Sequence, residues 1–210
     1  MKLPFMKSLT AAAVVAGLAA YGIAASAAVA ETPQRGGILS FMVASEVPSY
    51  DLHRETTFGV IHPIAPFYSL LVRINPEDPS ASTDFVCDLC VGKVAEPTDG
   101  GKTYTFKIRT DVKFHDGTPL TVQDVKATFD KIVFPPQGVA SARRAQMTMA
   151  EAVEAPDNET VIFRLKYPSG AFMPALATPF NAVYSKKDLD AHGYDWHAKN
   201  INGTGPFVFV

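Results

Sequence analysis

The 210-residue chain has little cysteine and little tryptophan, with two residues of the first and one of the second. Charge is also scarce, because charged residues make up 19% of the chain and Lys+Arg 19 against Asp+Glu 21 gives a net charge of −2. A general nucleic-acid-binding protein needs a basic excess, which this composition lacks. No internal repeat or charge block interrupts the sequence, and 47% of the residues are apolar. The composition therefore indicates a folded, nearly neutral protein rather than a disordered tail.

Residues 1–30 have the layout of a secretory signal peptide. A basic start is followed by an apolar run over residues 9–25 and by Ala28-Val29-Ala30, a small-x-small cleavage pattern. The run is long enough that an uncleaved anchor is the alternative, but its alanine-rich, weakly apolar composition favours cleavage. We therefore predict a signal peptide at 1–30 and a mature domain at 31–210, exported to an oxidising compartment.

The mature domain alternates patterns typical of strands and of helices. The clearest strand pattern is the apolar–polar alternation over 104–109, and the clearest helix begins at a capping box formed by Thr121 and Asp124. Strands are expected at 38–44, 104–109, 149–155, 160–165, 182–184 and 206–210. Helices are expected at 122–133, 171–177 and 186–192, and in part of 58–72, where two prolines forbid one regular helix.

Two motifs invite a catalytic or cofactor-binding interpretation. Phe114-His115-Asp116-Gly117-Thr118 places a histidine beside an aspartate, but no serine or cysteine nucleophile is placed near it by a motif. We interpret it as a turn, in which the aspartate binds nearby backbone N–H groups and the glycine takes a positive φ. Gly203-Thr204-Gly205 lacks the third glycine of a dinucleotide-binding motif and precedes a proline, so it is also interpreted as a turn.

Cys87-Asp88-Leu89-Cys90 is the third pattern with chemical potential. We interpret it as a local disulfide of an exported protein, which requires a turn because an extended strand would hold the two Cα atoms too far apart. A pair of free thiols is the next interpretation, and a thiol-redox site is weakened by the absence of a βαβ pattern. The five histidines supply no second ligand pair at zinc-site spacing, so neither a metal site nor a cofactor is predicted.

Three longer segments carry a more specific pattern. They are residues 104–125 with their Phe-His-Asp-Gly-Thr-Pro sequence, residues 162–172, and residues 203–207 with their Gly-Thr-Gly-Pro-aromatic sequence. Together they resemble family 5 of the bacterial extracellular solute-binding proteins, which feed peptide-type ABC importers. The resemblance implies an α/β fold, one lobe of a type II periplasmic binding protein with a mixed sheet and flanking helices. Family members are much longer and have two lobes, so the chain resembles an incomplete, N-terminal part of the first lobe.

The resemblance implies a non-enzymatic, periplasmic protein that captures a peptide or similar small solute for the permease of an ABC importer in the inner membrane. A monomer is expected. In this family the loop after the first strand lines the ligand cleft, which implies a ligand-binding role for Ser45, Glu46, Val47 and Pro48. An ordinary strand-to-helix loop is the alternative. A secreted thiol-redox protein using the cysteine pair and a carrier of metal or metal chelates remain open, the latter because the family includes nickel importers.

Overall fold

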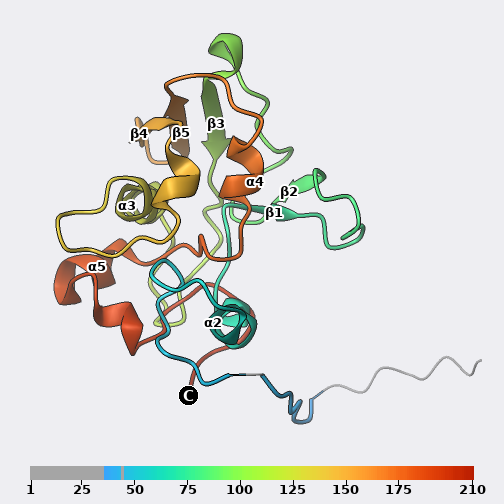
Figure 1. Ribbon diagram of the computed structural model, residues 1–210, viewed down its shortest axis with the longest axis vertical. Coiled ribbons are helices and arrows are strands. Elements are labelled where there is room, and N and C mark those ends of the chain that lie inside the picture. The colour runs from blue at the N-terminus through green and yellow to red at the C-terminus, as the bar shows by residue number, and fades with distance from the viewer. Residues whose placement is uncertain (1–35, 44) are drawn as a thin grey trace, which may run out of the picture. The chain divides into compact units, whose positions relative to one another are not determined.

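The computed structural model describes residues 36–43 and 45–210, so the signal peptide expected at 1–30 lies outside the described residues. Residues 42–210 form one compact unit (Figure 1). The helices are α2 (Phe58–Ile64), α3 (Val122–Val133), α4 (Phe172–Leu176) and α5 (Lys186–His192). The strands are β1 (Val72–Ile74), β2 (Phe85–Cys87), β3 (Thr103–Lys107), β4 (Ala150–Glu154) and β5 (Thr160–Leu165). Short 3-10 turns occur at Ala65–Phe67, Asp99–Gly101, Arg144–Met147 and Trp196–Ala198.

A three-stranded antiparallel sheet, in the order β3-β5-β4, follows the predicted strand patterns. Tyr104 lies opposite Phe163 and Phe106 lies opposite Val161, so these four side chains share one face. That face is buried, whereas Lys107 lies on the exposed face. β1 and β2 form a second, separate antiparallel pair. The unit thus combines helices and strands, as expected for an α/β fold, but the strands make two small antiparallel sheets instead of one mixed sheet.

Helix α3 occupies the range that the capping box predicted. The Asp124 carboxylate accepts a hydrogen bond from the Thr121 N–H at 2.7 Å, and the helix ends just before Pro135-Pro136. Its apolar stripe is buried against the sheet, where the rings of Phe129 and Phe163 meet edge to face at 4.9 Å between centroids. Because α3 and α4 pack on the same face of the three-stranded sheet, the other face is left to polar side chains.

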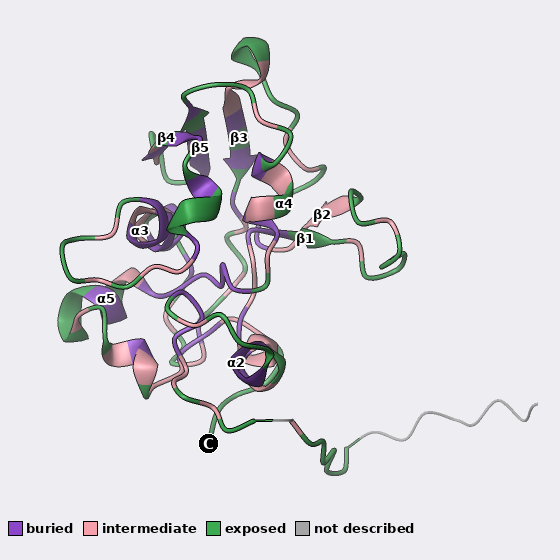
Figure 2. Ribbon diagram, in the orientation of Figure 1, coloured by how far each residue is buried: buried purple, intermediate pink, exposed green. Residues whose placement is uncertain are grey.

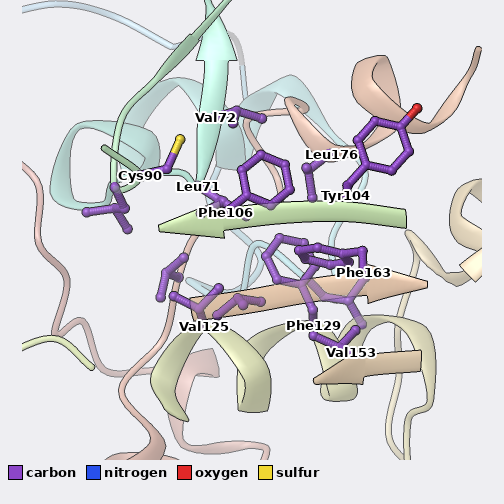
Figure 3. Close-up of a cluster of buried hydrophobic side chains, with 14 of the residues drawn as sticks. Leu71, Val72, Cys90, Tyr104, Phe106, Val125, Phe129, Val153, Phe163 and Leu176 are labelled. Carbon is purple, nitrogen blue, oxygen red and sulfur yellow. The ribbon is translucent and has the colours of Figure 1, made fainter. Parts of the chain in front are cut away.

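Buried apolar side chains gather in two clusters. The larger core joins the three-stranded sheet to α3, α4 and the β1–β2 pair, and Figure 3 shows Phe106, Phe129 and Phe163 at its centre. The smaller core surrounds α2, at the end of the unit away from the sheet, and contains much less regular structure (Figure 2). Its buried members are Leu52, Val60, Ile61, Ile64, Tyr68, Phe180, Ala182, Tyr184 and Leu189.

Two apolar segments that the sequence predicts as strands are not strands. Residues 38–43 have no regular secondary structure, and the side chains of Ile38, Leu39 and Met42 are exposed. Phe207–Val210 is likewise irregular and exposed. A strand forms only where its backbone N–H and C=O groups meet a neighbouring strand, and neither segment has one within the described residues.

The strand predicted at 182–184 is wrong for a different reason, since these residues are fully buried. The Val183 N–H donates to the Ser69 carbonyl at 3.1 Å, and the Tyr184 N–H donates to Thr128 Oγ1 at 2.9 Å. The extended backbone therefore pairs with a loop and with a helix side chain instead of a strand.

The predicted helices at 171–177 and 186–192 are confirmed by α4 and α5. In the 58–72 segment, α2 continues to Ile64 despite Pro63, and the chain then tightens into the 3-10 turn that contains Pro66. None of the helices in the described ranges has the length and apolar character that crossing a membrane requires.

Candidate functional site

The predicted ligand-binding loop, Ser45–Pro48, is largely exposed to solvent. Glu46 and Pro48 are exposed, and Val47 is half-buried against the smaller core. Ser45 Oγ occupies the space beside Gly59 of α2, where an added Cβ would lie 1.9 Å from it. Within the described part of the chain, no group hydrogen-bonds to the backbone of Glu46 or Val47. These backbone groups thus have no hydrogen-bond partner among the described residues.

The residues that follow the loop are held firmly. Ser49 Oγ donates to Glu55 Oε1 at 2.9 Å, and the Tyr50 N–H donates to the Ala198 carbonyl at 3.0 Å. The Tyr50 ring also meets the Phe209 ring edge to face at 5.3 Å. The loop is thus followed by a segment, Ser49–Tyr50, that hydrogen bonds and ring packing hold in place.

Asp51, the next residue, is the centre of a buried polar cluster. Its Oδ1 accepts hydrogen bonds from the His53 N–H and from the Tyr184 hydroxyl, each at 3.0 Å. Lys131 Nζ of α3 lies 3.2 Å from Oδ1 and 3.0 Å from Oδ2, and both side chains of this ion pair are essentially buried. The Tyr184 hydroxyl in turn accepts from the Leu52 N–H at 2.8 Å. Each donor at this carboxylate therefore comes from a different part of the sequence.

The charges of the pair depend on each other. Burial by itself would raise the pKa of Asp51, but the Lys131 charge and the hydrogen bonds outweigh burial and lower that pKa. Burial lowers the pKa of Lys131, against the opposing attraction of Asp51. A buried charge without its partner is costly, so each group stabilises the ionised form of the other.

Two histidines enclose Tyr184. The His53 ring stacks on the Tyr184 ring at 4.0 Å between centroids, and the His197 ring stacks at 3.8 Å. Burial, assisted by the Lys131 charge, lowers the pKa of His53 to about 3. The same two causes lower the pKa of His197 to about 3. Both rings are therefore neutral at pH 7, and His53 Nε2 donates its proton to the Ala182 carbonyl at 2.8 Å.

None of these cluster residues is predicted as a site from the sequence. The signal that could have found them is a polar stripe on α3, next to its apolar stripe: Asp124, Thr128 and Lys131 follow one another at spacings of four and three. All three are buried. Such a stripe requires polar partners elsewhere in the chain, and Tyr184 and Asp51 supply them to Thr128 and Lys131.

The histidine-containing turn is structural, as predicted. Asp116 Oδ1 accepts from the Thr118 N–H at 3.0 Å, and Gly117 has a φ of 85°. His115 Nε2 donates to the Gly205 carbonyl at 3.0 Å, and the His115 N–H donates to the Gly203 carbonyl at 2.9 Å. The turn at His115 therefore holds Gly203-Thr204-Gly205, the second motif that is predicted to be a turn.

Both glycines of that second motif lie against the backbone of the segment after α2. A Cβ at Gly203 would lie 1.9 Å from the Phe67 carbonyl oxygen, and one at Gly205 would lie 2.5 Å from the Pro66 carbonyl oxygen. The Gly205 N–H also donates to the Phe67 carbonyl at 3.0 Å. Close backbone approach, rather than binding of a phosphate, accounts for these glycines.

Cys87 and Cys90 are joined in a disulfide in the structure, with Cα atoms 4.9 Å apart. The turn between them is fixed because the Asp88 and Leu89 N–H groups donate to the Leu71 carbonyl. Cys90 is only 3% exposed and belongs to the larger core. Cys87, which a redox site would use as its nucleophile, is partly exposed, but it ends strand β2 instead of beginning a helix, whose N-terminus would favour the thiolate. The placement therefore favours a structural pair over a redox site.

Two surface hollows lie away from the predicted loop. An open groove of about 440 Å³ lies beside β2 and the disulfide, and a hollow of about 300 Å³ lies at the start of α3. The first is lined by Phe85, Val86, Cys87, Gly92, Lys93, Val94 and Glu96. Within residues 36–43 and 45–210, no three metal-ligating side chains come together.

Comparison with known proteins places these features in context. The sequence model of the family described as bacterial extracellular solute-binding proteins, family 5 Middle, matches residues 89–210. A curated relative named "Probable D,D-dipeptide-binding periplasmic protein DdpA", from Escherichia coli (strain K12), is 33% identical over 147 residues. The match covers 68% of this chain and 27% of the relative. The chain thus corresponds to little more than a quarter of that relative's length.

Two solved structures have a similar fold. A dipeptide-binding protein from Pseudoalteromonas sp. SM9913, in complex with Met-Leu, has a TM-score of 0.67 at 25% identity, over 78% of this chain and 35% of the other. The PBP AgaA from A. tumefacien R10, in complex with agropinic acid, has a TM-score of 0.67 at 26% identity, over 79% of this chain and 31% of the other. The likeness therefore extends over most of this chain and about a third of each neighbour.

Proposed function

The chain belongs to family 5 of the bacterial extracellular solute-binding proteins and has part of the type II periplasmic-binding-protein fold, and on this premise we propose that it is part of the substrate-binding component of an ABC importer. The component captures peptides or similar small solutes in the periplasm and delivers them to the inner-membrane permease. It acts as a monomer and catalyses no reaction. The observation that carries the proposal is the family match over residues 89–210, supported by a neighbour that holds Met-Leu.

The accessible loop supports a particular mode of capture. Backbone N–H and C=O groups at Glu46 and Val47 can pair with an extended peptide, as in the addition of a strand to a sheet. Such pairing recognises the main chain and tolerates many side chains. The exposed Glu46 carboxylate then binds the amino group of the ligand through a charge-assisted hydrogen bond.

Capture would proceed by closure of two lobes around the solute. The ligand stabilises the closed state through contacts that exist only in that state. This chain supplies one side of the cleft, because it spans about a third of the two-lobed neighbours. The fixed segment after the loop keeps that side in place during closure.

Calorimetric titration of the protein, as its own cells export it, tests the proposal. Met-Leu, its N-acetylated form and agropinic acid are the probes. We expect Met-Leu to bind more tightly than N-acetyl-Met-Leu, by about tenfold, because acetylation removes the charge that meets Glu46. In Glu46→Gln this preference should disappear.

Glu77→Gln is the matched control, since Glu77 is an exposed glutamate in the turn that follows β1. This variant should keep the wild-type preference for the free amine. Binding of agropinic acid in place of either peptide would move the ligand class to opine-like solutes. Failure of all three probes, and of longer peptides, would contradict solute capture by this protein.

A further inference from the structure

Tyr184 connects helix α3 to Asp51 and Leu52, the residues shortly after the predicted ligand-binding loop. The backbone of Tyr184 is clamped to α3, because its N–H donates to Thr128 Oγ1 at 2.9 Å and its carbonyl accepts from the same hydroxyl at 3.3 Å. The Tyr184 hydroxyl donates to Asp51 Oδ1 and accepts from the Leu52 N–H. Helix α3, which packs on the sheet, is thereby tied to the residues that follow the loop.

We propose that Tyr184 is a positioning residue for the Ser45–Pro48 loop, acting through Asp51 and Leu52 without touching the solute. The inference rests on the proposed function, since that function gives the loop its role. Asp51 follows Pro48 by three residues, which span at most about 10 Å of chain. The Asp51 N–H also donates to Ser49 Oγ at 3.3 Å, so we expect a displacement of Asp51 to reach the loop through Ser49.

The hydroxyl is separable from the rest of the side chain. The Tyr184 ring is held between His53 and His197, with Lys131 Nζ 4.9 Å from its centroid. Tyr184→Phe keeps all of this packing and removes only the two hydroxyl hydrogen bonds. The Leu52 N–H then loses its partner, and the Asp51 carboxylate loses one of its donors.

The chain offers a matched control in Tyr68. This tyrosine is also buried, and its ring lies 5.2 Å from the Tyr184 ring in the same core. Its hydroxyl is near the backbone of Asn202 but makes no hydrogen bond within the described residues. Tyr68→Phe thus removes a buried hydroxyl from the smaller core without releasing the segment after the loop.

The first readout is the affinity for Met-Leu at a temperature where circular dichroism shows every variant folded. We expect Tyr184→Phe to bind about tenfold more weakly, the equivalent of one hydrogen bond. Tyr68→Phe should stay within about twofold of the wild type. Unchanged affinity in Tyr184→Phe, or an equal loss in both variants, would overturn the inference.

The second readout is the pH profile of that affinity, which a merely structural role would not move. A hydrogen bond to a carboxylate favours its ionised form, so the acid limb should lie at higher pH in Tyr184→Phe than in the wild type or Tyr68→Phe. Coincident limbs in the three proteins would count against the inference. The titratable groups that face Asp51 are His53, Tyr68, Lys131, Tyr184 and His197.

Two further arms keep the outcomes distinct. If the wild type binds none of the probes, the proposed function fails, and hydrogen exchange decides the inference. The readout is the Tyr50 amide, which lies between Asp51 and the loop and keeps its Ala198 partner in both variants. Faster exchange of this amide in Tyr184→Phe alone supports the inference, and equal exchange overturns it. If Tyr184→Phe does not fold, Thr128→Ala and Thr128→Ser replace it. Only the serine keeps the hydroxyl that clamps Tyr184, so weaker binding in the alanine variant alone supports the inference, and equal affinities overturn it.

Discussion

The two cores of this protein differ in their secondary structure and in the polar groups buried beside them. The larger core is built mostly from strands and helices, and its buried side chains are hydrophobic (Figure 3). The smaller core surrounds α2 with irregular segments, and its margin contains the Asp51–Lys131 ion pair and two neutral histidines. Apolar burial stabilises by area and is indifferent to pH, whereas buried charges stabilise only while each has its partner.

Helix α3 takes part in both kinds of packing. Its apolar stripe, which includes Val125 and Phe129, is buried in the larger core. Its polar stripe, with Thr128 and Lys131, binds the segments of the smaller core. One helix thus joins a region specified by its apolar pattern to a region specified by a few polar contacts. Substitutions in the two cores should therefore differ in how much stability they cost and in how that cost depends on pH.

The largest effect is expected from breaking the buried ion pair. Lys131→Met leaves the Asp51 carboxylate buried without its counter-charge, which should lower the free energy of unfolding by about 4 kcal/mol. Adding Asp51→Leu should recover much of this loss, because an apolar pair avoids the unpaired charge. Urea denaturation of the single and double variants provides the measurement.

Lys126→Met is the control for that experiment, because Lys126 pairs with Asp130 on the partly exposed side of the same helix. Its cost should be about 0.5 kcal/mol. If Lys131→Met costs no more than Lys126→Met, the smaller core does not depend on its buried ion pair.

Acid should weaken the smaller core next. His53 and His197 have pKa values of about 3 in the folded protein, lowered chiefly by burial, against an ordinary pKa of 6.5. The unfolded chain therefore binds more protons below pH 6.5, and stability is full above that pH and falls as the pH drops toward 3. The difference in protonation of one such histidine should lower the free energy of unfolding by about 3 kcal/mol between pH 6.5 and pH 4.

His197→Phe separates this effect from other acid effects. Phenylalanine keeps the stack on Tyr184 but does not titrate, so the variant should lose stability less steeply over this pH range. The lowered pKa of Asp51 acts in the same direction in both proteins and cancels from the comparison. Parallel stability–pH curves for the two proteins would refute a titrating role of His197.

Most regular elements of the fold could be predicted because their signals are local, but the short strands β1 and β2 were not predicted. The alternation at 104–109 and the capping box at Thr121 each specify an element within a few residues. The apolar runs at 38–43 and 207–210 also predict strands, but a strand needs a neighbour, which local sequence does not reveal. Local patterns thus predicted the larger core better than its surroundings.

The buried cluster could not be predicted because its residues are far apart in the sequence. Asp51 and Tyr184 are 133 positions apart, and nothing local marks their contact. Arg143 is similar: a basic pair with Arg144 is typical of a solvated loop, yet Arg143 is buried and its guanidinium lies 4.3 Å from the Phe180 ring centroid. The ligand-binding assignment of Ser45–Pro48 came from family resemblance and stays a prediction.

A smaller effect should follow from adding a methyl group where two backbones meet. In Gly203→Ala the new Cβ would overlap the Phe67 carbonyl oxygen, so the segments beside the smaller core must separate. We expect a loss of about 2 kcal/mol in the free energy of unfolding. Gly170→Ala is the control, because nothing lies within 4 Å of its Cβ position. Equal stability of the two variants in urea would contradict the close approach.

The smallest effect concerns the disulfide at the edge of the larger core. The bond closes a loop of only four residues, so the entropy it removes from the unfolded chain is small, and its reduction should cost about 1–2 kcal/mol. Thiol titration of the protein, unfolded without reductant, should detect no free thiol, and two after reduction. Two free thiols before reduction would contradict the pairing.

The loss of stability on reduction should also be the same at pH 7 and pH 5, unlike the loss in Lys131→Met. The reason is that Cys90 is buried and neither cysteine belongs to the charged cluster. Insulin reduction by the wild type and by Cys87→Ser should be equally negligible, whereas activity that requires Cys87 would restore the redox interpretation.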